Sequence, residues 1–411
     1  MSSTVVKVHL DDTVKDNSFF KKPDSIETNR GELFKYAIMM WEVPSHITES
    51  DFDYLQSKVP ALEMLLSDAV HLTPEAVINL STDDRVQKLA SEAIGVGLGL
   101  KYSTDLLKTN PNKFKKIGVA ESGKYLDYST NVDSKQFEIE TKGTISANYN
   151  RMKNDIIRKK AEQKSSIYLR YGTIAMIQRE GSIAASKCVI VDDPPDNVPP
   201  VNEDIFEIQL LNYAILFSFI MDPKYYNKYI KPVITGRRQK IKIASNKFFA
   251  KYVFEGRTYL GECFDYRLIT EEVKRVMVES GDSSLDTFAL ITQKLGRTKF
   301  FIGLEDVVIQ AINKKRTDFL IGYNSPGRFI EELSSYKCLN QDGILLVKSV
   351  YGNDGQLEQI FSEEEVKRRL GLFSNYIKGV AHQCKAPCRS RGIVGKPCEK
   401  MTYQKHCYFH R

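Results

Sequence analysis

The stretch LDYSTNVDSKQFEIETKG, residues 126–143, decides how the centre of this chain folds. Two strand-like runs flank the tetrapeptide NVDS, whose Asn and Asp residues tolerate a tight turn. The pattern predicts a β-hairpin that turns at residues 131–134. Across such a turn, Asp127 on the first strand would lie near Glu140 on the second strand.

The charges of the second strand share one face of the predicted hairpin. Glu138, Glu140 and Lys142 occupy alternate positions, and side chains at alternate positions of a strand point the same way. Two carboxylates and an ammonium group are costly to hold together unless a cation lies between them, and Mg²⁺ prefers carboxylate oxygens. A solvated hairpin would show the same alternation. Asp133 is a second candidate acid, but it belongs to the turn and would point away, which favours Asp127.

This arrangement suits phosphodiester hydrolysis. We expect Asp127 and Glu140 to bind Mg²⁺ or Mn²⁺, with the backbone carbonyl of Thr141 as a further ligand. The metal would polarise the scissile phosphate and acidify a water molecule. Lys142 would orient that water or help to deprotonate it, and would offset the charge that develops on phosphorus.

Asp127 followed by Glu140-Thr141-Lys142 resembles the D…(D/E)-x-K signature of the PD-(D/E)XK nuclease superfamily. The order of expected elements over residues 85–220 (helix, hairpin, charged helix, strand, helix) is similar to the core of that fold. Leu126 stands where the signature often has Pro. The resemblance implies a restriction-endonuclease-like fold and a metal-dependent nuclease.

Three further residues could belong to this site. Glu92 lies in the helix expected before the hairpin, from which another carboxylate could approach. Gln209 and Tyr213 resemble the Q-x-x-x-Y motif of the RecB-like branch of the superfamily. The resemblance implies that Gln209 and Tyr213 contact the site or a substrate phosphate, although the same spacing also fits core packing on an apolar helix.

Two basic segments are candidates for binding nucleic acid. The charged helix that follows the hairpin, and the run RRQKIK, supply cations that could contact backbone phosphates. A solvated helix face explains the first segment equally well. The candidate residues are Arg151, Lys153, Arg158, Lys159, Lys160, Arg237 and Arg238.

The C-terminal tail predicts a zinc site. Four cysteines and a histidine fall in the pattern C-x3-C-x9-C-x8-C-x2-H, and clustered thiolates in a reducing compartment indicate metal more than disulfides. The tail resembles short zinc-binding modules of phage and bacterial proteins, which implies four of the ligands and leaves Cys388 as the alternative to His410. The five candidates are Cys384, Cys388, Cys398, Cys407 and His410.

The chain is expected to be an α/β (α+β) protein whose central mixed sheet is flanked by helices. We divide its 411 residues into a mainly helical region (1–83), the nuclease core (84–221), an α+β region without a legible role (222–377) and the zinc module (378–411).

Composition and charge limit the function classes. The chain has 42% hydrophobic and 27% charged residues and a net charge of +7, which is compatible with nucleic acid without requiring it. No secretory signal or membrane-spanning run is apparent, so a cytoplasmic protein without membrane partners is expected.

The sequence predicts a Mg²⁺-dependent deoxyribonuclease, restriction-like or defence-associated, with endonuclease action favoured. An inactive DNA-binding or assembly protein and an RNA-directed nuclease are the alternatives. A homo-oligomer is compatible with the sequence.

Overall fold

The computed structural model describes most of the chain between residues 3 and 359, together with two short strands of the tail. The described ranges are 3–14, 17–20, 23–41, 43, 52–117, 126–163, 167–192, 205–221, 223–234, 243–269, 271, 298–332, 335–350, 357–359, 382–383 and 401–402. All structural statements below concern these residues.

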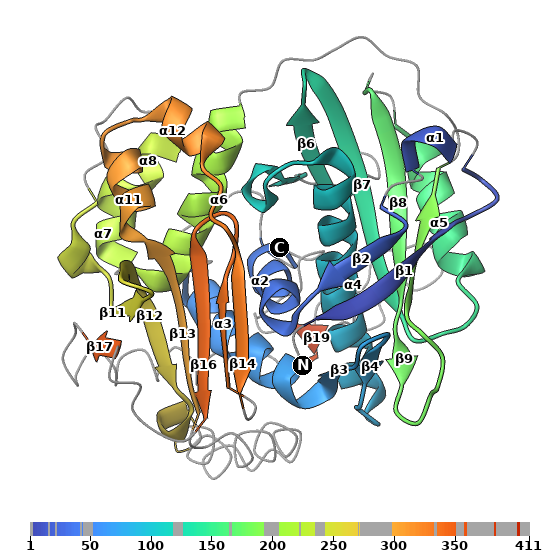
Figure 1. Cartoon of the computed structure of the whole chain (residues 1–411), viewed down its shortest axis with the longest axis horizontal. Coiled ribbons are helices and arrows are strands. Elements are labelled where there is room, and N and C mark those ends of the chain that lie inside the picture. Colours follow the sequence, from blue (N-terminus) through green and yellow to red (C-terminus); the bar gives the residue numbers. More distant parts are fainter. Residues whose placement is uncertain are drawn as a thin grey trace.

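The first sheet is mixed and has seven strands in the order β2-β1-β10-β8-β7-β6-β5 (Figure 1). Two pairs are parallel, β1 with β10 and β7 with β8, and the other neighbours are antiparallel. Its strands are β1 (Thr4–Leu10), β2 (Ser25–Thr28), β5 (Lys115–Lys116), β6 (Tyr128–Val132), β7 (Lys135–Thr144), β8 (Leu169–Met176) and β10 (Lys187–Val191). The expected mixed α/β class is confirmed.

Strands from both sides of residue 83 build this sheet. β1 and β2 come from the region expected to be mainly helical, and β1 pairs with β10 in register Lys7 to Lys187. The same region contributes α1 (Asn17–Phe20), α2 (Arg30–Met40) and α3 (Phe52–Ala69). Residues 4–28 therefore complete a sheet whose centre is formed by residues 128–191.

The hairpin expected at residues 126–143 is present as β6 and β7. Its loop consists of Asp133 and Ser134, both with positive φ (50° and 61°), as in the two-residue turns whose twist matches that of the strands. The register pairs Tyr128 with Ile139, which places Asp127 opposite Glu140.

The second sheet has seven strands in the order β14-β15-β16-β13-β12-β11-β17, and all its neighbours are antiparallel. It comes from residues 250–359 of the region expected to be α+β. Its strands are β11 (Ala250–Phe254), β12 (Arg257–Asp265), β13 (Thr298–Glu305), β14 (Arg328–Glu332), β15 (Ser335–Leu339), β16 (Ile344–Val350) and β17 (Leu357–Gln359).

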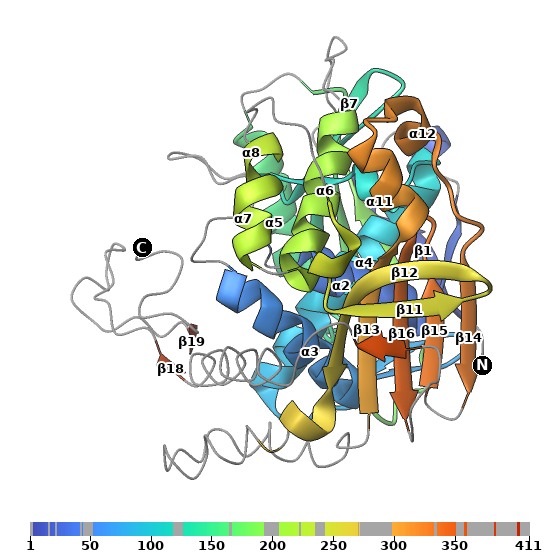
Figure 2. The same cartoon turned by 90° about the vertical axis from the view of Figure 1, so that its left-hand side faces the viewer.

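A layer of helices lies between the two sheets (Figures 1 and 2). It contains α2, α3, α4 (Asp84–Leu107) and α6 (Ile205–Ile220). One hydrophobic core runs through this layer and joins side chains of both sheets, from Val6 on β1 to Leu346 on β16. By contrast, α5 (Asn150–Ala161) packs on the outer face of the first sheet, where Ile156 contacts Ile174 and Val189.

The remaining elements are short. They are β3 (Val70–Leu72), β4 (Val77–Asn79), β9 (Gln178–Arg179), α7 (Pro223–Tyr229), α8 (Lys231–Ile234), α11 (Asp306–Asn313), α12 (Thr317–Gly322), β18 (His382–Gln383), β19 (Met401–Thr402) and the 3₁₀ turns η2 (Pro111–Lys113) and η3 (Ser245–Lys247).

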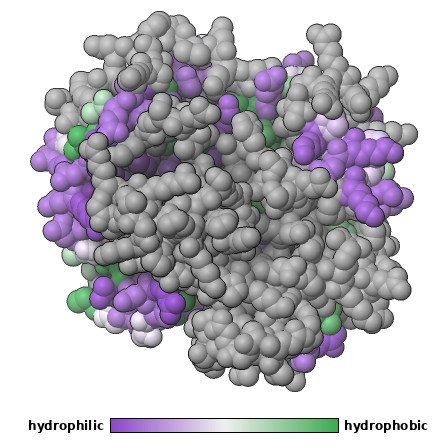
Figure 3. All heavy atoms as spheres, turned by 180° about the vertical axis from the view of Figure 1, so that it is seen from behind, coloured by the Kyte–Doolittle hydropathy of each residue, from purple (hydrophilic) through white to green (hydrophobic). Residues whose placement is uncertain are grey.

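The surface of the described residues is mainly polar. Their exposed large hydrophobic side chains are Val5, Ile183, Val307 and Ile321. Hydrophilic colours dominate the described atoms seen from behind (Figure 3). None of the described helices has the length and apolar character needed to cross a membrane.

Helix α4 lies directly against the backbone of β7 because glycines face each other there. A Cβ atom on Gly143 would lie 1.8 Å from the carbonyl oxygen of Ser91, and one on Gly95 would lie 2.4 Å from the amide nitrogen of Gly143. Neither contact can be relieved by turning a side chain, because both neighbours are backbone atoms. The sequence GVGLGL therefore serves helix–sheet packing.

We predict that Gly143→Ala lowers the free energy of unfolding by about 3 kcal/mol, because α4 must move away from β7. Gly322→Ala is the matched control, since a Cβ atom there meets nothing within 4 Å. It should change the free energy of unfolding by less than about 0.5 kcal/mol. Urea denaturation followed by circular dichroism measures both values, and equal stabilities would contradict the packing argument.

Candidate active site

Asp127 lies at the start of the hairpin, with its carboxylate bound to the facing strand. Its Oδ2 atom accepts hydrogen bonds from the backbone N–H of Thr141 (3.0 Å) and from the Thr141 hydroxyl (3.2 Å). Burial raises the pKa of Asp127, but the ammonium groups of Lys116, Lys142 and Lys159 and the Thr141 N–H outweigh it. The pKa of Asp127 therefore lies below its ordinary value and the group is ionised at neutral pH.

Glu140 is fully buried and faces α5. Its Oε1 atom contacts two ammonium groups, those of Lys142 (2.5 Å) and Lys159. Its Oε2 atom is also buried, yet has no hydrogen-bond partner among the residues that the structure describes. An unsatisfied buried acceptor costs about 1–3 kcal/mol. Burial and the neighbouring charge of Asp127 raise the pKa of Glu140, although both lysines oppose the rise.

A second carboxylate supports Lys142 from the side of α5. The ammonium group of Lys142 lies 3.7 Å from Oδ2 of Asp155, and Arg158 holds the other oxygen of Asp155 at 2.5 Å. Burial lowers the pKa of Lys142, but Glu140, Asp127 and Asp155 together raise it above its ordinary value. Lys142 is therefore a cation at neutral pH, which favours its electrostatic role over proton abstraction.

The donor set of this site fits a hard divalent cation. Asp127 and Glu140 stand opposite each other, and Oε2 of Glu140 lacks a partner that a cation would supply. Within the described part of the chain, no group of three or more His, Cys, Asp or Glu side chains is placed to hold a metal ion. The third protein ligand that we expect is accordingly a backbone atom, the carbonyl of Thr141.

Glu92 lies on the other side of the sheet. α4 packs against the face opposite α5: Gly99 of α4 approaches Thr141, whereas Gly172 of β8 approaches Ile156 of α5. The side chain of Glu92 is 46% exposed and lies 3.9 Å from Lys88 on the same helix. Its part in the site stays a prediction without support from this placement.

Most basic residues expected to bind nucleic acid point inward from α5. Lys153 pairs with Asp11 (2.7 Å), Lys160 is buried against Asp192, and Lys159 contacts Glu140. Asp11 and Asp192 directly follow β1 and β10, and Glu140 lies in the middle of β7, so α5 covers carboxylates that belong to three strands. The other two candidates on α5, Arg151 and Arg158, are exposed.

Gln209 and Tyr213 lie in a buried polar network that joins the two sheets. The side-chain amide of Gln209 donates to Oδ1 of Asn112 (3.1 Å) and to the carbonyl of Leu320 (3.2 Å). The Tyr213 hydroxyl accepts from the Asn112 side chain (2.8 Å) and donates to the carbonyl of Asp342 (3.1 Å). Burial raises the pKa of Tyr213. These contacts are structural, and none of them reaches Asp127, Glu140 or Lys142.

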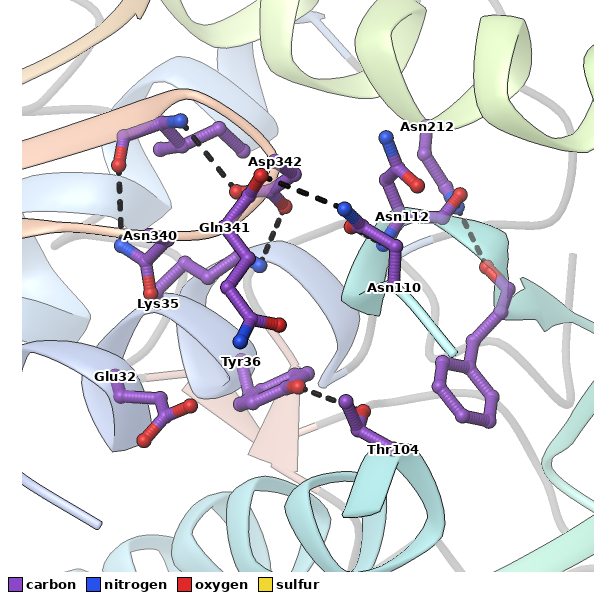
Figure 4. Close-up of polar contacts among 12 residues, drawn as sticks. Glu32, Lys35, Tyr36, Thr104, Asn110, Asn112, Asn212, Asn340, Gln341 and Asp342 are labelled. Atoms are coloured by element: carbon purple, nitrogen blue, oxygen red, sulfur yellow. Dashed lines mark hydrogen bonds and ion pairs between the residues drawn. The ribbon is translucent and has the colours of Figure 1, made fainter. Parts of the chain in front are cut away.

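Figure 4 shows the surroundings of this network. Lys35 of α2 forms a buried ion pair with Asp342 (2.5 Å), and the Asn110 side chain donates to the carbonyl of Gln341 (3.4 Å). Asn212 donates to the carbonyl of Asn112 (2.5 Å). The loop between β15 and β16 is thus bound to the helical layer by polar contacts as well as by the core.

The expected zinc ligands and the second basic run lie outside the described residues. They are Cys384, Cys388, Cys398, Cys407, His410, Arg237 and Arg238. Within residues 378–411 the structure describes only the antiparallel pair of β18 and β19.

Sequence reasoning missed three contributors to the site. They are the contact of Lys159 with Glu140, the contact of Asp155 with Lys142, and the charge of Lys116 beside Asp127, whereas the prediction that Lys159 binds nucleic acid stays a prediction. Asp155 and Lys159 are four residues apart, so they share a helix face. That spacing in the helix after Lys142 is the signal from which their proximity to the site could have been predicted.

Comparison of the chain with protein families, with curated proteins and with solved structures finds no match.

We predict that Tyr213→Phe lowers the free energy of unfolding by about 2 kcal/mol, because Asn112 and the carbonyl of Asp342 lose a buried partner. Tyr168→Phe is the control, since the Tyr168 hydroxyl meets only the exposed Lys135 in the contacts described. Denaturation curves of the two variants test the difference. A Tyr213 variant with wild-type stability and impaired activity would instead favour the site role that the Q-x-x-x-Y resemblance implies.

Proposed function

We propose that this chain is a Mg²⁺- or Mn²⁺-dependent deoxyribonuclease whose site is formed by Asp127, Glu140 and Lys142. The observation that carries the proposal is the environment of Glu140. It is a fully buried carboxylate with one unsatisfied oxygen, and it stands opposite a second carboxylate beside two lysines. An ion pair with only a structural role would need Glu140 and a lysine, but not a second carboxylate opposite Glu140. Two adjacent carboxylates are costly unless a cation lies between them.

The order of elements supports the same proposal. α4, β5, β6, β7, α5 and β8 follow one another along the chain, and the strands lie side by side as β8-β7-β6-β5. β7 and β8 are parallel because α5 crosses between them. This is the succession of helix, hairpin, charged helix and strand that the PD-(D/E)XK resemblance implies, with the signature residues on the hairpin.

Each site residue has a role that its contacts support. Asp127 and Glu140 would hold the cation, and Asp127 is kept ionised by the surrounding ammonium groups. Bound Mg²⁺ would supply Lewis-acid activation of water and of the scissile phosphate. Lys142, a cation held by Glu140 and Asp155, would donate hydrogen bonds to the attacking water and to the charge developing on phosphorus.

The substrate and the zinc module complete the proposal. DNA would approach from the side of α5, where Arg151 and Arg158 are exposed. We propose endonuclease action, and a C-terminal zinc module that helps to retain the nucleic acid through its Lys and Arg residues.

We predict that the purified chain cleaves supercoiled plasmid when Mg²⁺ or Mn²⁺ is added and does not cleave when EDTA is present. Glu140→Ala and Lys142→Ala should each lower the cleavage rate at least about 100-fold, because one removes a metal ligand and the other a cation at the phosphate. Cleavage retained in both variants would remove the proposed site.

The same assay separates the alternatives. Binding of a labelled duplex without cleavage under any divalent cation would indicate a DNA-binding or assembly protein with the same fold. Comparison of duplex DNA, single-stranded DNA and RNA of one sequence then decides the substrate. Faster cleavage of RNA than of DNA would replace the deoxyribonuclease by an RNA-directed nuclease.

We predict about one zinc ion per chain in protein purified without chelator, because the proposed module would use four of the five tail candidates as ligands of one ion. Elemental analysis of the full chain measures it. Cys398→Ser should lower the zinc content several-fold, whereas Cys263→Ser, a half-buried thiol of β12, should leave it unchanged. Absence of zinc from the wild-type protein would contradict the module.

A further inference from the structure

Glu140 cannot keep its present partners and also bind a metal ion through the same oxygen. Its Oε1 atom contacts both Lys142 and Lys159, and a divalent cation that takes this carboxylate must displace at least one ammonium group. The two lysines differ in the carboxylate partners that they keep once a divalent cation binds Glu140. This difference identifies the lysine that the cation displaces.

Lys142 forms an ion pair with a second carboxylate, whereas Lys159 acts on Asp127 and Asp155 through its charge without a described ion pair to either. The ammonium group of Lys142 lies 3.7 Å from Asp155, which Arg158 fixes in place. In the described part of the chain, the ion pairs of Lys159 are limited to Glu140. Its side chain is 18% exposed, so its ammonium group can reach a ligand that approaches from solvent. Loss of Glu140 would remove the ion pair that the described residues give Lys159, and only the charges of Asp127 and Asp155 would then offset it beside the metal.

Resting on the proposed function, we infer that Lys159 is a further catalytic residue: it holds Glu140 until a divalent cation takes that carboxylate, and then binds a non-bridging oxygen of the scissile phosphate. A phosphate oxygen is the anion that the proposed reaction brings to this place. Lys142 stays with Asp155 and serves the attacking water. Lys142 thus keeps the roles proposed above, and Lys159 adds a second cation at the phosphate.

The inference predicts opposite effects on metal binding and on cleavage when Lys159 is replaced. Lys159→Met preserves the length of the side chain and removes its charge. Because the competing ammonium group is absent, Mn²⁺ should bind about fivefold more tightly in isothermal titration calorimetry. Cleavage of a labelled duplex at saturating Mg²⁺, measured in a single turnover, should be about 100-fold slower because the phosphate loses a cation.

Two further variants make the experiment specific. Lys159→Arg retains the charge and should recover part of the cleavage rate while binding Mn²⁺ as the wild type does. Lys135→Met removes a cation from the exposed start of β7, the strand that carries Glu140. Lys135 contacts Tyr168 there, and its replacement should change neither measurement. Circular dichroism and denaturation curves establish that all variants are folded.

The outcomes separate this inference from the function on which it rests. Unchanged Mn²⁺ affinity in Lys159→Met, or tighter binding with a wild-type cleavage rate, overturns the inference. A wild-type protein that cleaves nothing overturns the proposed function, and the Mn²⁺ titration then decides by itself whether Lys159 competes for Glu140. Tighter metal binding combined with slower cleavage supports both.

Discussion

The close approach of α4 to β7 is the contact on which the arrangement of this protein depends. Glycines at 95, 99 and 143 remove the side chains that would keep the helix at an ordinary distance from the sheet. Side chains alternate between the two faces of a strand, so the residues of β7 next to those that meet α4 point to the outer face. Glu140 and Lys142 therefore meet α5, and the charged site forms outside the main core.

Charge compensation shapes the outer face in turn. α5 presents two lysines to carboxylates that directly follow strands β1 and β10, Lys153 to Asp11 and Lys160 to Asp192, and a third, Lys159, to Glu140 in the middle of β7. The lysines of this basic helix thus form ion pairs within the protein. Such pairs orient α5 in one way over the sheet, which places Asp155 beside Lys142 and gives the site its second layer of charges.

The hairpin could be predicted from sequence because its information is local. The turn at Asp133, the alternation of charged positions and the pairing of Asp127 with Glu140 all follow from residues within one short segment. The partners of helix faces could not be predicted. Periodicity shows that a helix has a polar face, but not whether that face meets solvent or the carboxylates of a sheet, so it does not predict the ion pair between Lys159 and Glu140. Gln209 and Tyr213 matched a short motif whose spacing also serves a buried network between distant segments.

The single core shared by the two sheets has a consequence for how the chain acquires its structure during synthesis. β1 can pair with β10 only after about 180 further residues have been synthesised. The second sheet can cover the helical layer only after β13 and β16 have emerged from the ribosome. Until then α2 and α3 expose apolar surface that the second sheet finally covers. The N-terminal half therefore buries all of its apolar surface only after the second sheet has been synthesised.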